Sequence, residues 1–269
     1  MLNGALRWLP SPFLKGSLVF HVATAAAVVA QTSLWPWAVG GIVANHLLIS
    51  ASGLVPRGAL LGPNVTRLPP RASGPPPVAI TIDDGPDPAV TPRVLEILDE
   101  YQARATFFCI GERVAAHPDI ACEIVRRGHA VENHSFHHPY RFSILGPRVM
   151  AEEISAAQDV ISAVVGEQPL FFRAPSGLRN PFLEPILSRM GLRLASWTRR
   201  GFDTVAGDPK VVRARLLRRL AAGDILLLHD GRAARTARGV PVILEVLPGI
   251  LDATARAGLN SITLRAAFN

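Results

Sequence analysis

The first hydrophobic pattern occupies the N-terminal part of the chain. Residues 17–30 and 37–55 contain no Asp, Glu, Lys or Arg, and each run approaches the roughly 20 residues that a membrane-spanning helix needs. Between them lies QTSLWPW, whose proline interrupts a helix and whose tryptophans suit a membrane interface. The pattern predicts a membrane hairpin within residues 1–58, with helices at about 16–33 and 37–55.

A cleaved signal peptide is the alternative, because VVA at 28–30 resembles a cleavage site of small residues. The second apolar run would then remain as an anchor. The basic residues that flank the hairpin are Arg7, Lys15, Arg57, Arg67 and Arg71, and its connecting loop carries no charge. The positive-inside tendency therefore predicts an inner (cytoplasmic) membrane protein with both ends of the hairpin, and the rest of the chain, on the cytoplasmic side.

The second pattern begins at residue 78, where short apolar runs alternate with helical periods. Strands are expected at 78–84, 105–110, 129–133, 170–174, 192–198, 224–229 and 260–264. Helical segments such as TPRVLEILDEY lie between them, and several end at a glycine, as helix C-caps do. This alternation predicts a parallel α/β sheet, and seven units favour a barrel. Pro-rich residues 59–77 are expected to form a linker to a single domain at 78–269.

Composition narrows the classes of function. Hydrophobic residues make up 49% of the 269 residues, and the mean hydropathy of +0.26 reflects the N-terminal runs. The net charge of +7 comes mostly from arginine, but no nucleic-acid recognition motif is present, so membrane lipids are the expected partner and nucleic acid is not. Cys109 and Cys122 make no disulfide framework and are expected to be buried.

Polar residues gather at the carboxyl ends of the expected strands. They are Asp83, Asp84, His134, His138, Arg173, Asp203, His229 and Asp230. In a parallel barrel these ends form one face, which is where such folds carry out chemistry. The segments would therefore bring these side chains to one site, although they are spread over about half of the chain.

The histidines indicate a metal centre. His134 and His138 are spaced by one helical turn and, with one carboxylate, would supply the three protein ligands of a catalytic Zn²⁺ or similar ion. On spacing alone His137 could replace His138, and either Asp83 or Asp84 could be the carboxylate, leaving the other as a base. Isolated histidines are more often structural, but here the pair shares a face with two carboxylates.

Two further charged residues end apolar strands. Arg173 could hold a site carboxylate ionised, and His229, at the end of ILLLHD, could donate a proton. Four motifs follow in order: TIDDGP at 81–86, HSFHH at 134–138, RAPSG at 173–177 and LLLHD at 226–230. With them the segment from about 78 to 265 resembles the polysaccharide deacetylase family, the NodB-homology domain of carbohydrate esterase family 4.

The resemblance implies a distorted TIM-like (β/α)7 barrel of the NodB type and assigns roles to the residues. Asp83 would be the catalytic base, oriented by Arg173, and His229 the general acid, tuned by Asp203. The implied metal ligands are Asp84, His134 and His138, a choice that favours His138 over His137. The implied cofactor is one divalent ion, with Zn²⁺ favoured over Co²⁺, Ni²⁺ or Mn²⁺.

The chain departs from the family pattern in two places. Ser176 stands where an aromatic residue usually walls the substrate groove, although its backbone N–H can still serve an oxyanion hole. The segment SWTRRGFD offers Trp197 and Asp203 without the usual Asp-Trp ending. Pro175, Ser176, Trp197 and Leu228 are the groove and oxyanion residues that the resemblance implies.

The predicted function is metal-dependent removal of N-acetyl or N-formyl groups from an amino sugar, in a glycan or a lipid-linked sugar at the membrane. One alternative is a catalytically silent glycan-binding membrane protein that keeps the fold. Another is an O-acetyl esterase, which would use the same residues.

Overall fold

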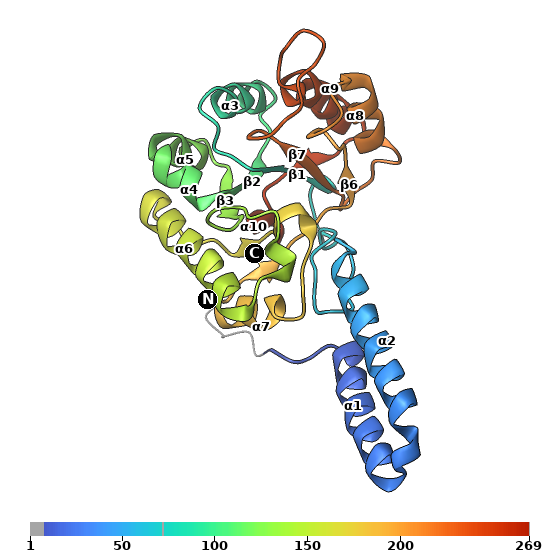
Figure 1. Ribbon diagram of the computed structural model, residues 1–269. Helices are drawn as coiled ribbons and strands as arrows, with labels where there is room; N and C mark the ends of the chain where they lie inside the picture. Colours follow the sequence, from blue (N-terminus) through green and yellow to red (C-terminus); the bar gives the residue numbers. More distant parts are fainter. Residues whose placement is uncertain (1–7, 72, 269) are drawn as a thin grey trace.

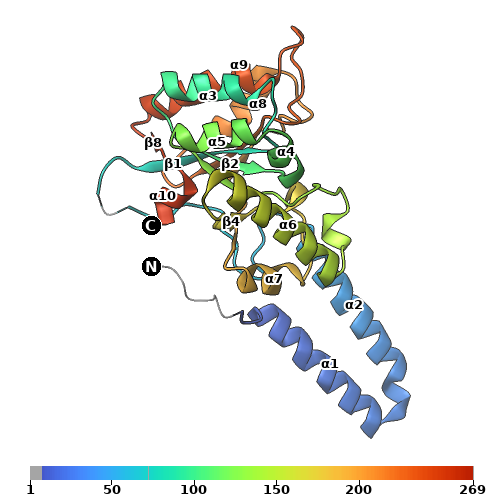
Figure 2. The same cartoon turned by 90° about the vertical axis from the view of Figure 1, so that its left-hand side faces the viewer.

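The computed structural model describes residues 8–71 and 73–268, and its N-terminal part is a pair of helices. Helix α1 (Pro12–Ala30), the short 3₁₀ helix η1 (Thr32–Leu34) and α2 (Trp35–Gly53) form an antiparallel hairpin that projects from an α/β body (Figures 1 and 2). Both helices are long and apolar enough to cross a membrane, a property that signal sequences share. Arg7, used above to orient the hairpin, lies outside the described residues.

Polar side chains join the two hairpin helices. Asn45 Nδ2 donates to Ser17 Oγ at 2.7 Å, and the Nε2 atoms of His21 and His46 lie 3.3 Å apart. Most of the apolar side chains face outward, and neither candidate span has buried residues within its most apolar window. A few polar contacts therefore hold the two helices together, and their apolar side chains remain exposed for contact with a membrane.

The base of the hairpin, residues 53–58, is attached to the α/β body by direct hydrogen bonds. The Gly53 carbonyl accepts from Arg179 N at 3.1 Å, and the Pro56 carbonyl accepts from Ser196 Oγ at 2.7 Å. Arg57 Nη1 donates to the Thr198 carbonyl at 3.0 Å. The two parts of the chain are thus in contact at a defined place.

The body contains one parallel sheet. Its strands are β1 (Pro77–Asp83), β2 (Ala105–Cys109), β3 (Ala130–Asn133), β4 (Phe171–Phe172), β5 (Arg193–Leu194), β6 (Arg199–Arg200), β7 (Ile225–His229) and β8 (Asn260–Ser261). The order is β5-β4-β3-β2-β1-β7-β6, and β8 pairs with the start of β1. Every residue of the central strands β1, β2 and β7 is buried, as expected of parallel strands covered on both faces.

Helices cover the strands. They are α3 (Thr91–Glu100), α4 (Gly111–Ala116), α5 (Pro118–Arg126), α6 (Pro147–Val165), α7 (Leu183–Arg189), α8 (Pro209–Leu217), α9 (Val242–Arg256) and α10 (Leu264–Phe268), with 3₁₀ turns η2 (Phe142–Ile144) and η3 (Pro175–Gly177). The main core lies between β1, β2, β7 and the apolar faces of α3, α5, α8 and α9. Figure 2 shows α3, α8 and α9 on the same side of the central strands.

The expected distorted (β/α)7 barrel is observed as an open parallel half-barrel. Of the strand predicted at 192–198 only β5 (Arg193–Leu194) forms. The next strand, β6, begins at Arg199, and β5 and β6 lie at opposite edges of the sheet and share no ladder in the described residues. Part of the gap is bridged by Val65 of the Pro-rich segment, which donates to the Leu194 carbonyl and accepts from Ser196 N at 2.9 and 2.8 Å. The apolar residues at 192–198 did not reveal this break, because an apolar pattern reflects burial and not strand pairing.

Two smaller expectations are also settled here. Cys109 is buried in β2, but Cys122 is exposed, because it lies on the outer side of the short helix α5. Residues 59–77 include Leu61 and Leu68, both buried, so much of this Pro-rich segment packs on the body instead of spanning open solvent.

The attachment of the hairpin yields a stability prediction. A methyl group at Gly53 would lie 2.0 Å from the Arg179 carbonyl oxygen, so Gly53→Ala should force α2 away from the body and cost about 1–3 kcal/mol, as overpacking does. The measurement is the thermal unfolding midpoint of the detergent-solubilised chain. Gly40→Ala in the same helix is the control, since its methyl meets nothing within 4 Å. Equal midpoints for the two variants would contradict this packing.

Candidate active site

A cavity of about 320 Å³ opens at the carboxyl ends of the central strands. Asp83 ends β1 and His229 ends β7, and the register of these neighbouring strands places the two residues side by side. The loops after β3 and β4 bring in the remaining polar groups. The strand ends thus converge as the sequence predicted, although the barrel is not closed.

Asp83 is held by Arg173, a buried residue that directly follows β4. Arg173 Nη1 donates to Asp83 Oδ1 at 2.6 Å and to Thr81 Oγ1 at 2.8 Å. Its other nitrogens donate to the Ala195 and Ser196 carbonyls at 3.2 and 2.8 Å. Burial lowers the pKa of Arg173 and the Asp83 charge opposes this shift; an arginine keeps its proton in any case, so the pair is ionic.

Asp84 faces away from Arg173. It follows the end of β1 with φ of +73°, and its Oδ1 lies 3.3 Å from Nε2 of both His134 and His138. Burial raises the pKa of Asp84, but the neighbouring His134, with His229 and His138, outweighs burial and holds this pKa well below its usual range. Oδ1 is buried and has no hydrogen-bond partner in the described residues, so it is an orphaned acceptor.

The spacing of His134 and His138 had indicated a helical turn. In the structure the two histidines lie instead in a tight loop after β3. Asn133 Oδ1 accepts from Ser135 N at 2.9 Å, and Ser135 Oγ accepts from His138 N at 3.1 Å. Both Ser135 and His138 have positive φ, which lets the chain reverse and bring their neighbours together. The His134 and His138 ring centroids are 4.8 Å apart.

Hydrogen bonds orient the first ring. His134 Nδ1 lies 2.8 Å from the Arg173 carbonyl, so a proton on Nδ1 leaves the Nε2 lone pair directed at the site. His137 is instead exposed, and its Nδ1 pairs with Glu153 at 2.7 Å. The structure therefore brings His138, and not His137, to Asp84.

His138 carries a second constraint. Burial and the neighbouring His134 lower its pKa to about 4, which keeps the ring neutral, as a metal ligand must be. Arg232 Nη1 lies 3.1 Å from its Nδ1. If His138 binds a metal through Nε2, its proton lies on Nδ1. Because a guanidinium can only donate hydrogen bonds, Arg232 must then move away from Nδ1.

These three residues fit a divalent cation. Asp84, His134 and His138 each offer one ligand atom, and these atoms all lie within 4.8 Å of one another. A cation would satisfy the orphaned Asp84 Oδ1 and offset a buried negative charge. One carboxylate and two imidazoles form a donor set that leaves coordination positions open for a substrate.

Asp203 and His229 form a second buried pair. His229 Nδ1 is 2.9 Å from Asp203 Oδ1, and His229 N donates to Asp203 Oδ2 at 2.7 Å. Burial opposes the charged ring, but the hydrogen bond and charge of Asp203, with Asp83 and Asp84, raise the pKa of His229 to about 9. The atypical segment SWTRRGFD therefore does deliver a carboxylate to His229.

The expected groove residues divide into two groups. Ser176, with φ of +57°, and Trp197 line the cavity. Pro175 is buried beneath Ser176, and Leu228 lies in the core between the sheet and the helices, so the cavity is lined by Leu227 instead. The assignment of Leu228 was wrong by one residue, which in a strand changes the face on which a side chain lies.

Among the lining residues that sequence reasoning missed are Tyr140, Arg200 and Arg232. Tyr140 and Arg232 each lie two residues beyond a motif, and their proximity to those motifs was an available signal. Arg200 had no such signal, because it looked like one of many solvent-facing arginines.

Comparisons with known proteins agree with this geometry. The polysaccharide deacetylase family model matches residues 71–195. A peptidoglycan-N-acetylglucosamine deacetylase of Bacillus cereus is 34% identical over 173 residues, which are 64% of this chain and 80% of that protein. A chitooligosaccharide deacetylase of Azorhizobium caulinodans is 38% identical over 155 residues, which are 57% of this chain and 73% of that protein.

The solved structures give the same result. A family 4 carbohydrate esterase from Streptomyces lividans, in complex with acetate, superposes with a TM-score of 0.62 at 31% identity and covers 69% of this chain and 91% of its own. Sequence and fold agree over most of the α/β body. The chain belongs to the polysaccharide deacetylase family, whose members are hydrolases of N-acetyl amide bonds.

Proposed function

We propose that this protein removes an N-acetyl or N-formyl group from an amino sugar, carried by a glycan or a lipid-linked sugar at the membrane. The observation that carries the proposal is the meeting of three groups in one cavity. They are the Asp84–His134–His138 cluster, the Asp83–Arg173 pair and the Asp203–His229 pair. Together they supply metal ligands, a base and an acid.

Asp84, His134 and His138 would hold the metal. Zn²⁺ is the proposed ion because its preferred ligands are imidazole and carboxylate, and Co²⁺, Ni²⁺ and Mn²⁺ accept the same donors. A bound cation of this kind supplies Lewis acidity: it lowers the pKa of water and polarises an amide carbonyl.

Asp83 is the proposed general base. Its Oδ1 is occupied by Arg173, while its Oδ2 lies 3.8 Å from His134 Nε2, beside the metal-binding atoms. Arg173 stabilises the ionised carboxylate and fixes its direction, so Oδ2 is left to take a proton from the attacking water. The backbone N–H of Ser176 is the proposed donor to the oxyanion, by the resemblance described above.

His229 is the proposed general acid. Asp203 accepts from Nδ1 and stabilises the protonated ring, so Nε2 can donate to the departing amine, which is too basic to leave unprotonated. The base and the acid thus have separate partners, an arrangement that lets one site hold both at neutral pH.

The alternatives remain open to the same assays. A silent glycan-binding protein would not need an Arg173–Asp83 pair and an Asp203–His229 pair aimed at the metal ligands, which favours an enzyme. An O-acetyl esterase would use the same groups, and release of acetate from N-acetylated and O-acetylated sugars distinguishes the two activities.

The hairpin is proposed to lie in the inner membrane, with the catalytic body on the cytoplasmic side. Lys15 and Arg57 lie near the end of the hairpin that adjoins the body, while η1 at the other end carries no charge. The positive-inside tendency then places the body with the basic end.

The proposed activity is tested by acyl release from N-acetylglucosamine oligosaccharides and from N-formyl amino sugars with Zn²⁺-loaded protein. Asp83→Asn should lower kcat by at least about 10²–10⁴, the usual contribution of a general base, while the metal content stays unchanged. Asp99→Asn, which alters an exposed carboxylate of α3, is the control. Absence of acyl release from all of these sugars by metal-loaded wild type would refute the enzyme, and full activity of Asp83→Asn would refute this base.

The ligand assignment predicts a difference between adjacent histidines. His138→Ala should weaken Zn²⁺ binding by more than about 100-fold, beyond what loss of an outer partner costs, because it removes a ligand atom. His137→Ala should leave binding unchanged, since His137 pairs with Glu153 at the surface. Calorimetric titration of the metal-free variants measures both affinities, and the reverse order would overturn the assignment.

The Asp203–His229 pair predicts a shift in the pH profile. The protonated His229 needed for catalysis is lost as pH rises through its pKa, which Asp203 raises. Asp203→Asn removes that charge, so the alkaline limb of kcat should move to lower pH. Asp208→Asn, at the exposed start of α8, is the control and should leave the limb in place. An unshifted limb in Asp203→Asn would show that His229 does not set it.

A further inference from the structure

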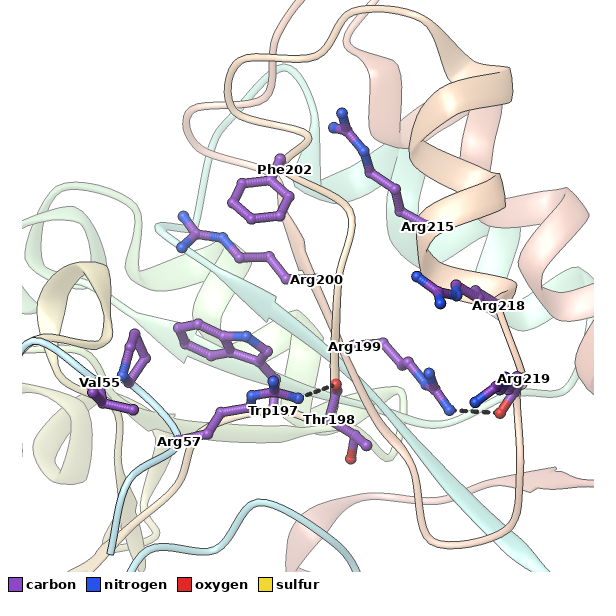
Figure 3. Close-up of a pocket in the computed structure, with 11 residues that line it drawn as sticks. Val55, Arg57, Trp197, Thr198, Arg199, Arg200, Phe202, Arg215, Arg218 and Arg219 are labelled. Atoms are coloured by element: carbon purple, nitrogen blue, oxygen red, sulfur yellow. Dashed lines mark hydrogen bonds between the residues drawn. The ribbon is translucent and has the colours of Figure 1, made fainter. Parts of the chain in front are cut away.

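A second cavity of about 550 Å³ lies beside the active site, and arginines dominate its wall (Figure 3). They come from three parts of the chain: the base of the hairpin, strand β6, and α8 with the residues that follow it. The six are Arg57, Arg199, Arg200, Arg215, Arg218 and Arg219. No carboxylate is among the described residues that line this cavity, which we call the arginine pocket.

The charge of the arginine pocket is largely uncompensated. Within residues 8–71 and 73–268, Arg199 is the only one of the six that pairs with a carboxylate, Asp224, at 3.1 Å. Arg57 and Arg215 donate to backbone carbonyls, which carry no net charge. The Nε of Arg200 is buried and has no hydrogen-bond partner in the described residues. Like charges repel one another and attract anions, so an anionic ligand would stabilise this pocket.

The arginine pocket adjoins both the active site and the hairpin. Trp197 and Arg200 line the pocket and the active-site cavity alike. On the other side, Val55 and Pro56 of the hairpin base line it, directly after the end of α2. A ligand that extends from the active site toward the apolar helices therefore passes the arginines.

Apolar and cationic surfaces alternate within the pocket. The Arg200 guanidinium lies 4.9 Å from the Phe202 ring centroid and 5.3 Å from that of Trp197. Figure 3 shows Phe202 between Arg200 and Arg215, with Trp197 below Arg200 and near Arg57. Such a wall suits a ligand with an anionic group attached to an apolar chain.

We propose that the arginine pocket binds the phosphate ester of a lipid-linked substrate, with the N-acyl amino sugar in the active-site cavity and the lipid chain directed toward α2. The proposal rests on the deacetylase function proposed above and names its substrate class. Phosphate is favoured over a carboxylate because its tetrahedral oxygens point in different directions, so guanidinium groups on different sides of the pocket can each donate to one of them. Arg199, Arg200 and Phe202 belong to SWTRRGFD, where this chain departs from the family pattern.

Binding can be tested without turnover. Calorimetry would compare farnesyl phosphate with farnesol on the full zinc-loaded chain in neutral detergent. We expect the phosphate to bind at least about tenfold more tightly, as two or more charge-assisted hydrogen bonds allow. The double variant Arg215→Gln, Arg218→Gln should lose that difference, whereas Arg148→Gln, Arg189→Gln, which neutralises two exposed arginines of α6 and α7, should keep it. Equal binding of the two probes to wild type would overturn the proposal.

Two further probes distinguish the source of the phosphate. Inorganic phosphate and dioleoylphosphatidylglycerol are titrated as competitors of farnesyl phosphate. Weak competition by both supports a site for the substrate's own phosphate. If inorganic phosphate competes equally well, the pocket takes free phosphate, and if the phospholipid does, it takes bulk lipid headgroups. Either result would overturn the substrate assignment.

Turnover separates this proposal from the function on which it rests. The substrates are N-acetylglucosamine joined to farnesol through a phosphodiester and the matching glycoside without phosphate. Wild type should show at least about tenfold higher kcat/KM for the phosphodiester, and the Arg215→Gln, Arg218→Gln variant should reduce this ratio toward one. Equal kcat/KM for the two substrates would overturn the arginine-pocket proposal alone. Absence of turnover of both substrates, with tight farnesyl phosphate binding retained, would instead count against the deacetylase function.

Discussion

The site depends first on the buried ion pair between Arg173 and Asp83. The Arg173 guanidinium donates to the side chains of Thr81 and Asp83 at the end of β1. It also donates to the carbonyls of Ala195 and Ser196. The Arg173 carbonyl in turn fixes the His134 ring. Removing either charge would leave the other buried without a partner, a change that costs about 3–5 kcal/mol. Because Arg173 joins β1 to the segment between β5 and β6, it also compensates for the missing strand pairing there.

The other charged residues of the site also have separate partners. Asp84 is directed at His134 and His138 and offers an orphaned oxygen to a cation, while Asp203 raises the pKa of His229. The adjacent carboxylates of Asp83 and Asp84 are tolerated because each has its own compensation. This division would let the proposed base, acid and metal ligands share a cavity of about 320 Å³.

The hairpin adjoins the active site. Its base is hydrogen bonded to the segment 196–198, which also supplies Trp197 to the active site. The arginine pocket lies at the same place, so apolar helices, cationic wall and catalytic cavity are contiguous. A substrate that combines a lipid, a phosphate and an amino sugar would match these three surfaces in order.

The sequence by itself determined the parallel α/β architecture and which polar residues end its strands. It could do so because buried parallel strands are continuous apolar runs, and Asp83 and His229 end such runs. The spacing of the histidines left His137 and His138 open and the resemblance favoured His138; the tertiary structure is what places His138 beside Asp84 and His137 at the surface. Only the tertiary structure shows that the chain passes from one sheet edge to the other between β5 and β6. It also decided the gathering of six arginines from three segments. Loop conformation, strand pairing and contacts between distant segments leave no periodic pattern along a chain, so only the folded molecule reveals them.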